Sequence, residues 1–481
     1  MKGDPRDLRA YLDAGPIHFM GIGGAGMCAL AEAVLRGGGR VTGCDARPGP
    51  SVGALERMGV RVHTGHDPGH LDGAGALVVS AAVAADPPEI ARARAEEIPV
   101  LKRAEALGGW VNAGRVLGVS GTHGKTTTTA LLTGMLAEAG ADPTGFVGGE
   151  VLGWQSHLRA GTGALFVVEA DEYDRSFLHL RPEVAVVTNV EADHLDVYGS
   201  LNGVEAGFGA YLAGVRKGGT VVACADDPGA GRVIQGELPV GVTLVTYGLS
   251  AGATVRGEDL RYRDGVAHLR VRERGVDRGR LQVGLPGVHN VRNALGAAAA
   301  ARVIGVEWGT IHRALEGFDG VRRRFQIAGE VRGVRVVDDY AHHPTEVTAT
   351  LEAARTGHPG RRIVAVFQPH LYTRTRDLGR EFGKALAAAD EVWVTEVYPA
   401  REPPIPGVDG KYLAGLVEAE GAPAGGVHLH AELDTLPAAL AGALRPGDLC
   451  LLMGAGSIER VPRLLLTALH GSGAETEVSH A

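Results

Sequence analysis

The sequence predicts an α/β protein of three domains, each built on a mostly parallel β-sheet. Its 481 residues exceed the usual size of one domain, and this length favours about three. Apolar strand-like runs alternate with alanine-rich helical patterns along the chain, as expected of repeated βα units. The 73 glycines suit the many tight turns that such units require.

The first domain is predicted over residues 1–112 and is Rossmann-like. A strand in "IHFMGI" leads into a glycine loop and a helix in "MCALAEAVLRGG", and strands follow at "RVTGCD" and 76–83. The central domain, 113–320, is predicted to be of the P-loop type. Its strand at 115–120 enters a second glycine loop and a helix, and its other expected elements are buried strands at 164–172, 184–196 and 220–227, a polar antiparallel insert at 250–282 and a helix in "GVHNVRNALGAAAAARVIG".

The third domain, 321–470, shows the same α/β spacing and is again Rossmann-like, with strands expected in "VRVVDD", "RIVAVFQPH", "EVWVTEVYPA" and "DLCLLMGAGS". The polar end of the chain, 471–481, has the composition of a disordered tail.

Composition and charge restrict the class of protein. The net charge of −8 argues against nucleic acid as a partner, and no apolar run approaches the ~18–20 residues that span a bilayer. The four cysteines form no CxxC pair, and the start of the chain lacks an apolar signal core. We therefore expect a cytoplasmic protein with reduced cysteines, a monomer or weak homodimer that acts on small molecules and has no membrane partner.

The first glycine loop, "HFMGIGGAGM", contains G-x-G-x-x-G at Gly21, Gly23 and Gly26, and Asp45 follows about twenty residues later. This pattern alone predicts a nicotinamide dinucleotide site, and therefore an oxidoreductase.

The second loop, "GVSGTHGKTTTT", favours ATP. Amides at the start of the following helix can cradle phosphates, Lys125 can reach the terminal phosphates, and Thr126 offers a hydroxyl to Mg²⁺. Val119 stands where the full P-loop pattern has glycine. An alternative is a strand–helix turn that binds nothing.

Acidic residues follow the strands beside this loop. Glu169 lies at the mouth of one strand, and His194 follows the next between Asp193 and Asp196. We predict that Thr126, Glu169 and His194 bind metal. The alternatives are a solvated strand end for the acids and a structural role for the histidine.

The segments "GTHGKTTTT", "EADEYDRSFLHLRPEVAVVTNVEADHLD", "GVHNVRN", "RRRF", "DDYAHHPTE" and "FQPHLYTRTRD", with the first loop, resemble the Mur ligases of peptidoglycan synthesis from residue 18 to about 456. The resemblance implies an ATP-dependent, amide-forming ligase that joins L-alanine to the lactyl carboxylate of UDP-N-acetylmuramate through an acyl phosphate. It implies that the first loop holds the UDP-sugar, and that the third domain brings the amino acid. A ligase that joins a whole tripeptide to the same sugar nucleotide is the alternative within the family.

The resemblance also implies roles for single residues. Lys125, Glu169, His194 and Arg324 would neutralise charge during catalysis. The UDP-sugar would be bound by Gly21, Ile22, Gly23, Gly24, Ala25, Gly26, Asp45 and Ser80. ATP would be bound by Gly121, Thr122, His123, Gly124, Lys125, Thr126, Thr127, Asn290, Asn293, Arg324 and Asp339. The amino acid would be bound by Tyr340, His342, His370 and Arg374, with Leu371 where the family often has arginine.

Overall fold

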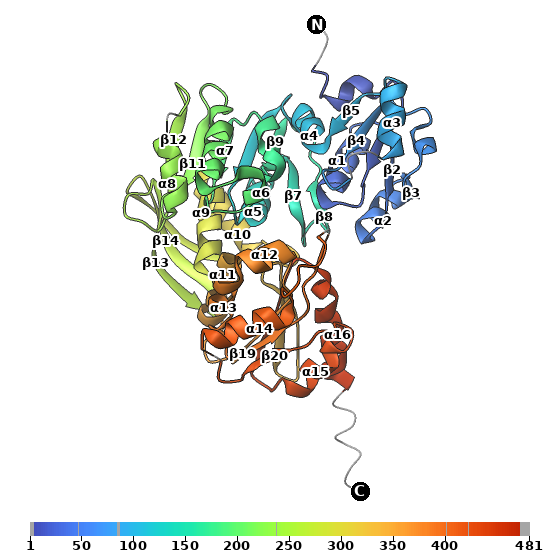
Figure 1. Ribbon diagram of the computed structural model, residues 1–481. Helices are drawn as coiled ribbons and strands as arrows, with labels where there is room; N and C mark the ends of the chain where they lie inside the picture. Colours follow the sequence, from blue (N-terminus) through green and yellow to red (C-terminus); the bar gives the residue numbers. More distant parts are fainter. Residues whose placement is uncertain are drawn as a thin grey trace. The chain divides into compact units, whose positions relative to one another are not determined.

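The computed structural model describes residues 4–46, 48–83, 87–236, 238–400, 402–421 and 423–471 (Figure 1). Within these ranges the chain forms three α/β domains, whose strands make sheets of five, ten and six strands. Two compact units are present. The first runs to Val321 and the second begins at Arg322, except that residues 260–268 and 283–291 belong to the second unit. The domain boundaries at 112/113 and 320/321 stay predictions.

The first sheet has the order β3-β2-β1-β4-β5, and all its neighbouring strands are parallel. The strand order reverses beside β1, and ligands of such sheets bind at this reversal, beyond the carboxyl ends of the strands. Met20 pairs with both Cys44 and Val79, which brings the segments after β1, β2 and β4 to one edge. The elements are β1 Ile17–Met20, α1 Ala25–Arg36, β2 Val41–Asp45, α2 Pro50–Arg57, β3 Arg61–Thr64, β4 Ala76–Val79, α3 Pro88–Ala95, β5 Val100–Lys102 and α4 Arg103–Val111.

The central sheet has the order β15-β14-β13-β12-β11-β10-β6-β9-β7-β8. Strand β6 lies between β10 and β9, and Val119 pairs with Glu169 while Ser120 pairs with Val187. This register places the second glycine loop, the end of β9 and the end of β10 at one edge. The elements are β6 Arg115–Ser120, α5 Lys125–Glu138, β7 Thr144–Val151, β8 Ser156–Arg159, β9 Leu165–Glu169, β10 Val184–Val187, α6 Leu195–Tyr198, α7 Leu201–Ala213, β11 Thr220–Cys224, α8 Pro228–Gln235, β12 Thr243–Gly248, α9 Val288–Val303 and α10 Trp308–Glu316.

The polar segment predicted as an insert forms β13 Val255–Arg263, β14 Val266–Glu273 and β15 Val276–Val283, which continue the central sheet. Their two turns are Asp264-Gly265 and Arg274-Gly275, and all four residues have positive φ. Turns of this kind match the twist of a two-residue β-hairpin. The strands alternate buried and exposed positions, which explains their polar sequence.

The third sheet has the order β16-β17-β21-β18-β19-β20; β16 runs antiparallel to β17, and the other neighbouring strands of the described residues are parallel. Met453 pairs with both Asp339 and Phe367, so the segments after β17, β18 and β21 meet at one edge. The elements are β16 Gln326–Val331, β17 Val334–Asp339, α11 Pro344–Gly357, β18 Ile363–Phe367, α12 Tyr372–Asp377, α13 Gly379–Leu386, β19 Glu391–Val394, α14 Gly410–Ala419, β20 Val427–Leu429, α15 Leu436–Ala443, β21 Leu449–Met453 and α16 Val461–Gly471.

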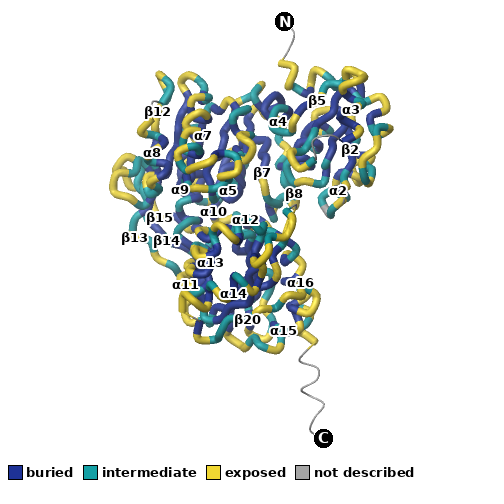
Figure 2. The backbone as a smooth tube through the Cα atoms, viewed as in Figure 1, coloured by how far each residue is buried: buried dark blue, intermediate teal, exposed yellow. Residues whose placement is uncertain are grey.

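The sheets form the buried centres of the domains (Figure 2). Strands β1, β10, β11, β18 and β21 are buried along their length, as expected of parallel strands covered on both faces. In the central domain, Phe177 stacks on Tyr211 with ring centroids 4.9 Å apart. The predicted strands at 76–83, 164–172 and 184–196 are shorter in the structure, because the chain leaves the sheet after Val79, Glu169 and Val187.

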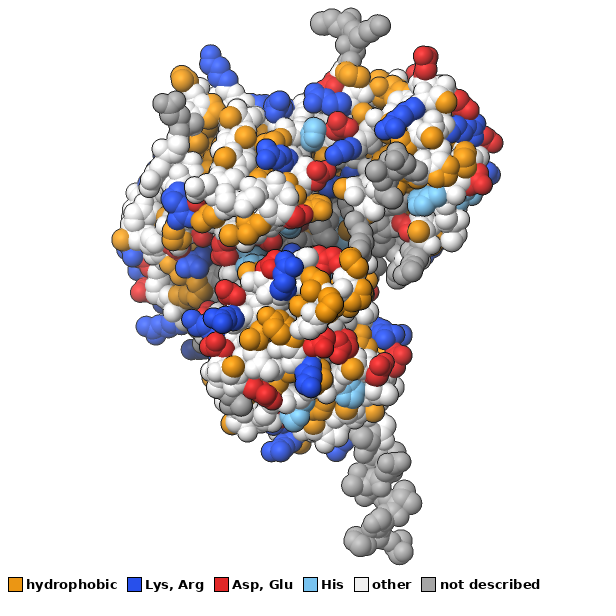
Figure 3. All heavy atoms as spheres, in the orientation of Figure 1, with side chains coloured by type: hydrophobic (Ala, Val, Ile, Leu, Met, Phe, Trp, Pro, Cys, Tyr) orange, Lys and Arg blue, Asp and Glu red, His pale blue; other side chains and the backbone are white. Residues whose placement is uncertain are grey.

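No helix in the described ranges combines the length and apolar character needed to cross a membrane. On the face that Figure 3 shows, basic and acidic side chains are interspersed. The predicted tail lies outside the described residues from 472 onward, and Gly471 ends α16.

Candidate active site

The first glycine loop packs against the carboxyl end of β2. The amides of Gly21 and Ile22 donate to the carbonyl of Cys44 at 2.8 and 3.1 Å. The amide of Gly23 donates to the Asp45 carboxylate at 2.9 Å, so this acid braces the loop. A Cβ at Gly23 would lie 2.9 Å from that carboxylate, which leaves no room for a side chain.

The structure gathers the predicted UDP-sugar residues around the start of α1. A Cβ on Gly21 would lie 3.0 Å from that of Ser80, and Gly24 is the N-cap of the helix that begins at Ala25. A Cβ on Gly26 would lie 2.9 Å from a guanidinium nitrogen of Arg103. Free amides of a first helical turn favour an anion, and Arg103 brings a cation beside them. Sequence reasoning missed Arg103, because nothing in its local sequence marks it.

The second glycine loop joins β6 to α5 along a path that requires glycine. Gly121 and Gly124 have φ of +138° and +80°. A Cβ on Gly124 would collide with the side-chain oxygen of Asn293, and one on Gly121 with the hydroxyl of Thr188. Helix α5 then begins at Lys125, with its first amides at the mouth of the loop.

Residues after β10 hold this loop in place. Thr188 Oγ1 donates to the carbonyl of His123 at 2.6 Å, and the His123 amide donates to Asn189 Oδ1 at 2.8 Å. The Glu191 amide donates to Thr122 Oγ1 at 2.9 Å. The predicted ATP residues Thr122 and His123 are therefore fixed by the neighbouring strand's carboxyl end, which preorganises the loop.

Lys125 folds over the loop onto a buried carboxylate. Its Nζ lies 2.7 Å from Glu172 Oε2, and it donates to the carbonyls of Gly121 and Thr122 at 2.7 and 3.1 Å. Burial would lower the pKa of Lys125, but the carboxylates of Glu172 and Asp171 outweigh it and the pKa is raised. The lysine is therefore a fixed cation at this sheet edge.

Glu172 joins Lys125 to His194. Its side chain is 2% exposed, and His194 Nε2 lies 3.6 Å from Glu172 Oε1. Burial would raise the pKa of Glu172, yet Lys125 and His194 lower it. Burial likewise opposes the charge of His194, and its pKa is raised by Glu172 and Asp193. Sequence reasoning noted four acids in this stretch and chose Glu169, so it missed Glu172.

Glu169 contacts Thr126, the second residue of helix α5. Thr126 Oγ1 donates to Glu169 Oε1 at 3.0 Å, and the Gly148 amide donates to Glu169 Oε2 at 2.6 Å. The three predicted metal ligands therefore lie around one sheet edge: Thr126 and Glu169 in direct contact, and His194 through Glu172 and Lys125. Thr127, next in the helix, is buried.

The two asparagines of α9 are both buried, and they have different neighbours. Asn293 lies against Gly124 of the phosphate-type loop. Asn290 belongs to the second unit, where its Nδ2 donates to the carbonyl of Pro286 at 2.8 Å and closes the start of the helix. Asn293 belongs to the same unit as the loop and lies beside it.

In the second unit, the predicted amino-acid residues form a chain of rings. Tyr340 lies 5.1 Å from His342, and His342 lies 5.9 Å from His370, between ring centroids. Burial lowers the pKa of His370 to about 4, with further lowering by His342 and Arg374, so this ring is neutral at pH 7. Tyr398, which sequence reasoning missed, stacks on His370 at 5.6 Å.

Leu371 begins helix α12 and has φ of +70°, a conformation unfavourable for a branched side chain. Its amide donates to the carbonyl of Tyr398 at 3.0 Å, which holds the turn that leads to Arg374.

The run Arg322–Arg324 separates into different environments. Arg323 is 8% exposed, and it contacts Asp338, Glu459 and the carbonyl of Gly454. Arg324 is more accessible, lies 5.2 Å from the Tyr340 ring and has Glu346 at 3.9 Å. Arg323 therefore has a structural role, and the Arg324 side chain remains accessible to a ligand.

The two aspartates that end β17 are buried. Asp339 accepts from the amides of Phe325 and Ala341 at 2.7 and 2.8 Å, so its carboxylate fixes the backbone on both sides. Burial raises the pKa of Asp339 despite Arg324. Burial also raises the pKa of Asp338 to about 6, although Arg323 opposes this.

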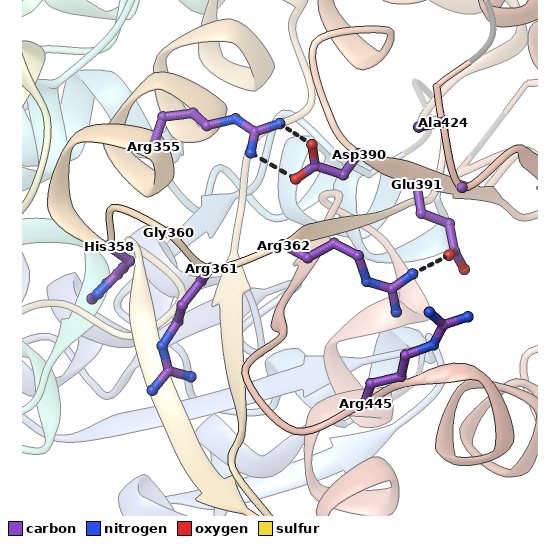
Figure 4. A pocket seen from close by; sticks show the side chains of 10 residues that line it. Arg355, His358, Gly360, Arg361, Arg362, Asp390, Glu391, Ala424 and Arg445 are labelled. Atoms are coloured by element: carbon purple, nitrogen blue, oxygen red, sulfur yellow. Dashed lines mark hydrogen bonds and ion pairs between the residues drawn. The ribbon is translucent and has the colours of Figure 1, made fainter.

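A separate pocket of about 710 Å³ lies in the second unit and is lined by several arginines (Figure 4). Arg355 forms a bidentate pair with Asp390 at 2.6 and 2.8 Å, and Arg362 contacts Glu391 at 2.9 Å and Asp448 at 2.6 Å. Arg355 and Arg362 are therefore already paired with carboxylates. We interpret their ion pairs as structural contacts that link the ends of neighbouring strands.

Family models match three successive parts of the chain: "Mur ligase family, catalytic domain" at residues 16–115, "Mur ligase middle domain" at 119–301 and "Mur ligase, glutamate ligase domain" at 323–456. The chain is 46% identical over 456 residues, 95% of each sequence, to the UDP-N-acetylmuramate–L-alanine ligase of Acidothermus cellulolyticus. It is 45% identical over 463 residues to the enzyme of the same name from Halorhodospira halophila, covering 95% of this chain and 94% of that one.

Solved structures agree. The UDP-N-acetylmuramate–alanine ligase of Thermotoga maritima superposes with a TM-score of 0.81 at 30% identity, over 95% of this chain and 99% of that one. A murein peptide ligase of Psychrobacter arcticus gives a TM-score of 0.69 at 26% identity, over 95% and 98%. The chain belongs to the Mur ligase family.

Proposed function

We propose that the protein joins L-alanine to the lactyl carboxylate of UDP-N-acetylmuramate, with conversion of ATP to ADP and phosphate. One observation carries the proposal: the loop that bears Lys125 and Thr126 lies against Glu169, Glu172 and His194 at one sheet edge. Relatives named for this reaction are 45–46% identical over 95% of the chain. Membership of a ligase family excludes the nicotinamide-dependent oxidoreductase as an alternative.

The reaction needs ATP because a carboxylate is a poor acylating agent. The lactyl carboxylate attacks the γ-phosphorus of ATP, so an acyl phosphate forms and ADP leaves. The amine of alanine then attacks the acyl carbon, and phosphate leaves from the tetrahedral intermediate. Both reactants of the first step are anions, so the site must neutralise charge.

Groups of this chain meet that need. Lys125 would keep its ion pair with Glu172 and exchange the loop carbonyls for phosphate oxygens, while the amides of the α5 first turn hold the phosphates. Glu172 and His194 would keep the lysine charged and correctly placed. Arg324 supplies a second accessible cation, and Arg374 can hold the carboxylate of alanine bidentately. The amides after β1 would hold the UDP diphosphate, with Arg103 beside them.

The donor set at the loop fits Mg²⁺, a hard cation that prefers oxygen ligands. Thr126 and Glu169 offer a hydroxyl and a carboxylate in direct contact, and both would hold the ion, with His194 at a second position. Bound there, Mg²⁺ would screen the charge on the phosphate oxygens. We place the reaction in the cytoplasm, where its nucleotide substrates are found, and retain the expectation of a monomer or weak homodimer.

The test is a turnover assay with the purified full chain. We would supply ATP, Mg²⁺ and UDP-N-acetylmuramate, add either L-alanine or the tripeptide, and follow phosphate release together with product mass. We expect a product heavier by one alanine residue and one phosphate per product. Turnover with the tripeptide alone would instead assign the peptide-recycling reaction, and phosphate release with neither amine would refute the proposed acceptor site. Lys125→Ala serves as the inactive control.

A further inference from the structure

A cluster of metal-binding side chain types lies in the first domain, outside the groups assigned above. Cys44 is near the end of β2, and His66 and His70 come from the segment after β3. Glu89 lies in the first turn of α3, and His18 lies within β1. These residues are far apart in sequence, and the parallel strand order brings them together.

Three of these side chains form a compact triangle. Cys44 Sγ lies 3.6 Å from His66 Nδ1 and 3.8 Å from Glu89 Oε1, and His66 Nδ1 lies 3.3 Å from Glu89 Oε1. Zn²⁺ binds nitrogen or oxygen at about 2.0–2.2 Å and sulfur at about 2.3 Å in a tetrahedron, which separates its ligand atoms by roughly 3.3–3.6 Å. The triangle therefore has nearly the size of one face of such a site.

A further histidine, His70, lies beside the triangle. His70 Nδ1 lies 3.7 Å from Glu89 Oε1. Separately, His18, Cys44 and His70 each place a ligand atom within 4.8 Å of the other two. His18 Nε2 also lies 3.4 Å from Cys44 Sγ, and its Nδ1 contacts Thr42 Oγ1 at 2.9 Å.

Two buried polar atoms in the cluster lack partners. Glu89 is 0% exposed, and its Oε2 has no hydrogen bond to any described residue. His70 Nδ1 is likewise buried and unpartnered within the described part of the chain. Only Oε1 of Glu89 is engaged by the backbone, accepting from the Asp67 amide at 2.8 Å. Leaving such groups unsatisfied is costly, and a cation in the cluster would compensate the buried charge of the Glu89 carboxylate.

We propose that the first domain binds one Zn²⁺ ion through Cys44, His66 and Glu89. Zinc is the divalent cation that matches a mixed thiolate, imidazole and carboxylate set. The side chain of His66 is 29% exposed, which gives the ion a route in.

Binding has a chemical balance that can be measured. A cysteine binds zinc as the thiolate, so the thiol loses its proton when the ion binds. Coordination forms the sulfur–zinc bond and releases that proton to solvent.

The site also has a structural consequence. The ion would link three parts of the domain: strand β2, the segment that follows β3, and helix α3. This link lies beside the carbonyl of Cys44, which accepts hydrogen bonds from the first glycine loop. The ion would therefore stabilise the sheet edge at which the UDP-sugar loop is built.

The experiment begins with the untagged full chain, purified without chelator, and measures bound zinc by elemental analysis. The metal-free protein is then titrated with Co²⁺, whose thiolate charge-transfer absorption reports a cysteine ligand directly. We expect about one zinc per chain, the cobalt–thiolate band and one proton released per ion.

Cys44→Ser should abolish the band and weaken Zn²⁺ binding by at least about 100-fold, since it removes a ligand and not an outer partner. Cys224→Ser, at another buried cysteine of the first unit, is the matched control and should change neither. Glu89→Gln should retain the band with weakened affinity, which keeps the test valid if Cys44→Ser does not fold. A wild-type protein that neither retains zinc nor develops the cobalt band would overturn the proposal, as would equal Zn²⁺ affinity in Cys44→Ser and the control.

Discussion

Lys125 and Glu172 form an ion pair whose side chains are 13% and 2% exposed, with Nζ 2.7 Å from Oε2. The same ammonium also donates to two carbonyls of its own loop. The cation that we propose for the phosphate site is therefore already desolvated and held within the loop. Its partner carboxylate is as important to the site as the lysine itself.

Glu172→Gln should destabilise the protein and reduce turnover. Breaking a buried ion pair costs about 3–5 kcal/mol, because one charge is left without its partner. Without the carboxylate, burial would lower the pKa of Lys125, so turnover should fall most at alkaline pH. Chemical denaturation and a pH–rate profile would measure both effects.

Glu183→Gln is the matched control for this change, since Glu183 pairs with Arg115 and the two side chains are 32% and 53% exposed. Surface pairs contribute about 0–1 kcal/mol. Equal losses of stability in the two variants would contradict a special role for the buried pair.

Thr126→Ala should increase the Mg²⁺ concentration required for half-maximal turnover by about 10-fold or more, because it removes one oxygen ligand. Thr126→Ser retains the hydroxyl and should behave nearly as the wild type. Turnover measured against Mg²⁺ at saturating ATP would decide this, and a response to Mg²⁺ that is identical in Ala and Ser variants would count against the metal role of Thr126.

The strand–loop–helix order was predictable, because apolar runs, glycine positions and the Gly-Lys-Thr sequence are local signals. It was not predictable that Glu172, and not one of its acidic neighbours, would pair with Lys125. After β9 the chain turns through Tyr173–His179, where Asp174 and Arg175 have positive φ, and this turn decides which acid faces Lys125. No periodic pattern specifies such a turn.

The burial of Arg323 and the proposed zinc site were also not predictable, because both depend on the folded chain and not on a local sequence pattern. Positive φ at Arg323 and Phe325 points consecutive arginines in different directions, so spacing alone cannot identify the buried one. Cys44, His66 and Glu89 share no sequence motif. They meet only because β2 pairs beside β1 and β3 in the folded sheet.

Asp338→Asn should alter how stability depends on pH. The folded pKa of Asp338, about 6, exceeds the ordinary value of 3.8, so the folded state holds a proton that the unfolded state has lost. Wild-type stability therefore falls as pH rises from about 4 to 6, by up to roughly 3 kcal/mol. The asparagine variant lacks this loss and should gain stability relative to wild type over the same range.

Denaturation at pH 4.5 and 7 would measure this difference, and a further measurement near pH 3 would reach the range in which Asp390 titrates. Asp390→Asn is the comparison with the opposite sign, because Arg355 lowers the pKa of Asp390 and its contribution is lost as pH falls. If both variants changed with pH in the same direction, the assignment of Asp338 would be wrong.

Arg374→Lys should raise KM for L-alanine by about 10-fold or more and leave KM for ATP nearly unchanged. A lysine keeps the charge but cannot hold a carboxylate with two parallel hydrogen bonds. Arg376 lies two residues further along α12, is 51% exposed and pairs with Asp377, so Arg376→Lys should have no effect. Initial rates against each substrate would separate the two, and a rise confined to KM for ATP would place Arg374 in a different site.

Arg323→Ala and Arg324→Ala should fail in different ways, although the residues are adjacent. Arg323 bonds to Asp338, Glu459 and the carbonyl of Gly454, so its loss leaves Asp338 and that carbonyl as buried acceptors and should cost about 3–5 kcal/mol of stability. The Arg324 side chain is 30% exposed and lies beside Glu346 and the Tyr340 ring, so its variant should keep nearly normal stability. If Arg324 stabilises charge on the phosphates, kcat should fall by about 10²–10³-fold. Thermal unfolding and steady-state kinetics on both variants would test this. The opposite result, a stable but slow Arg323 variant and an unstable Arg324 variant, would exchange the two roles. Because the side chains differ in burial and not in type, that result would show that burial does not identify the catalytic arginine.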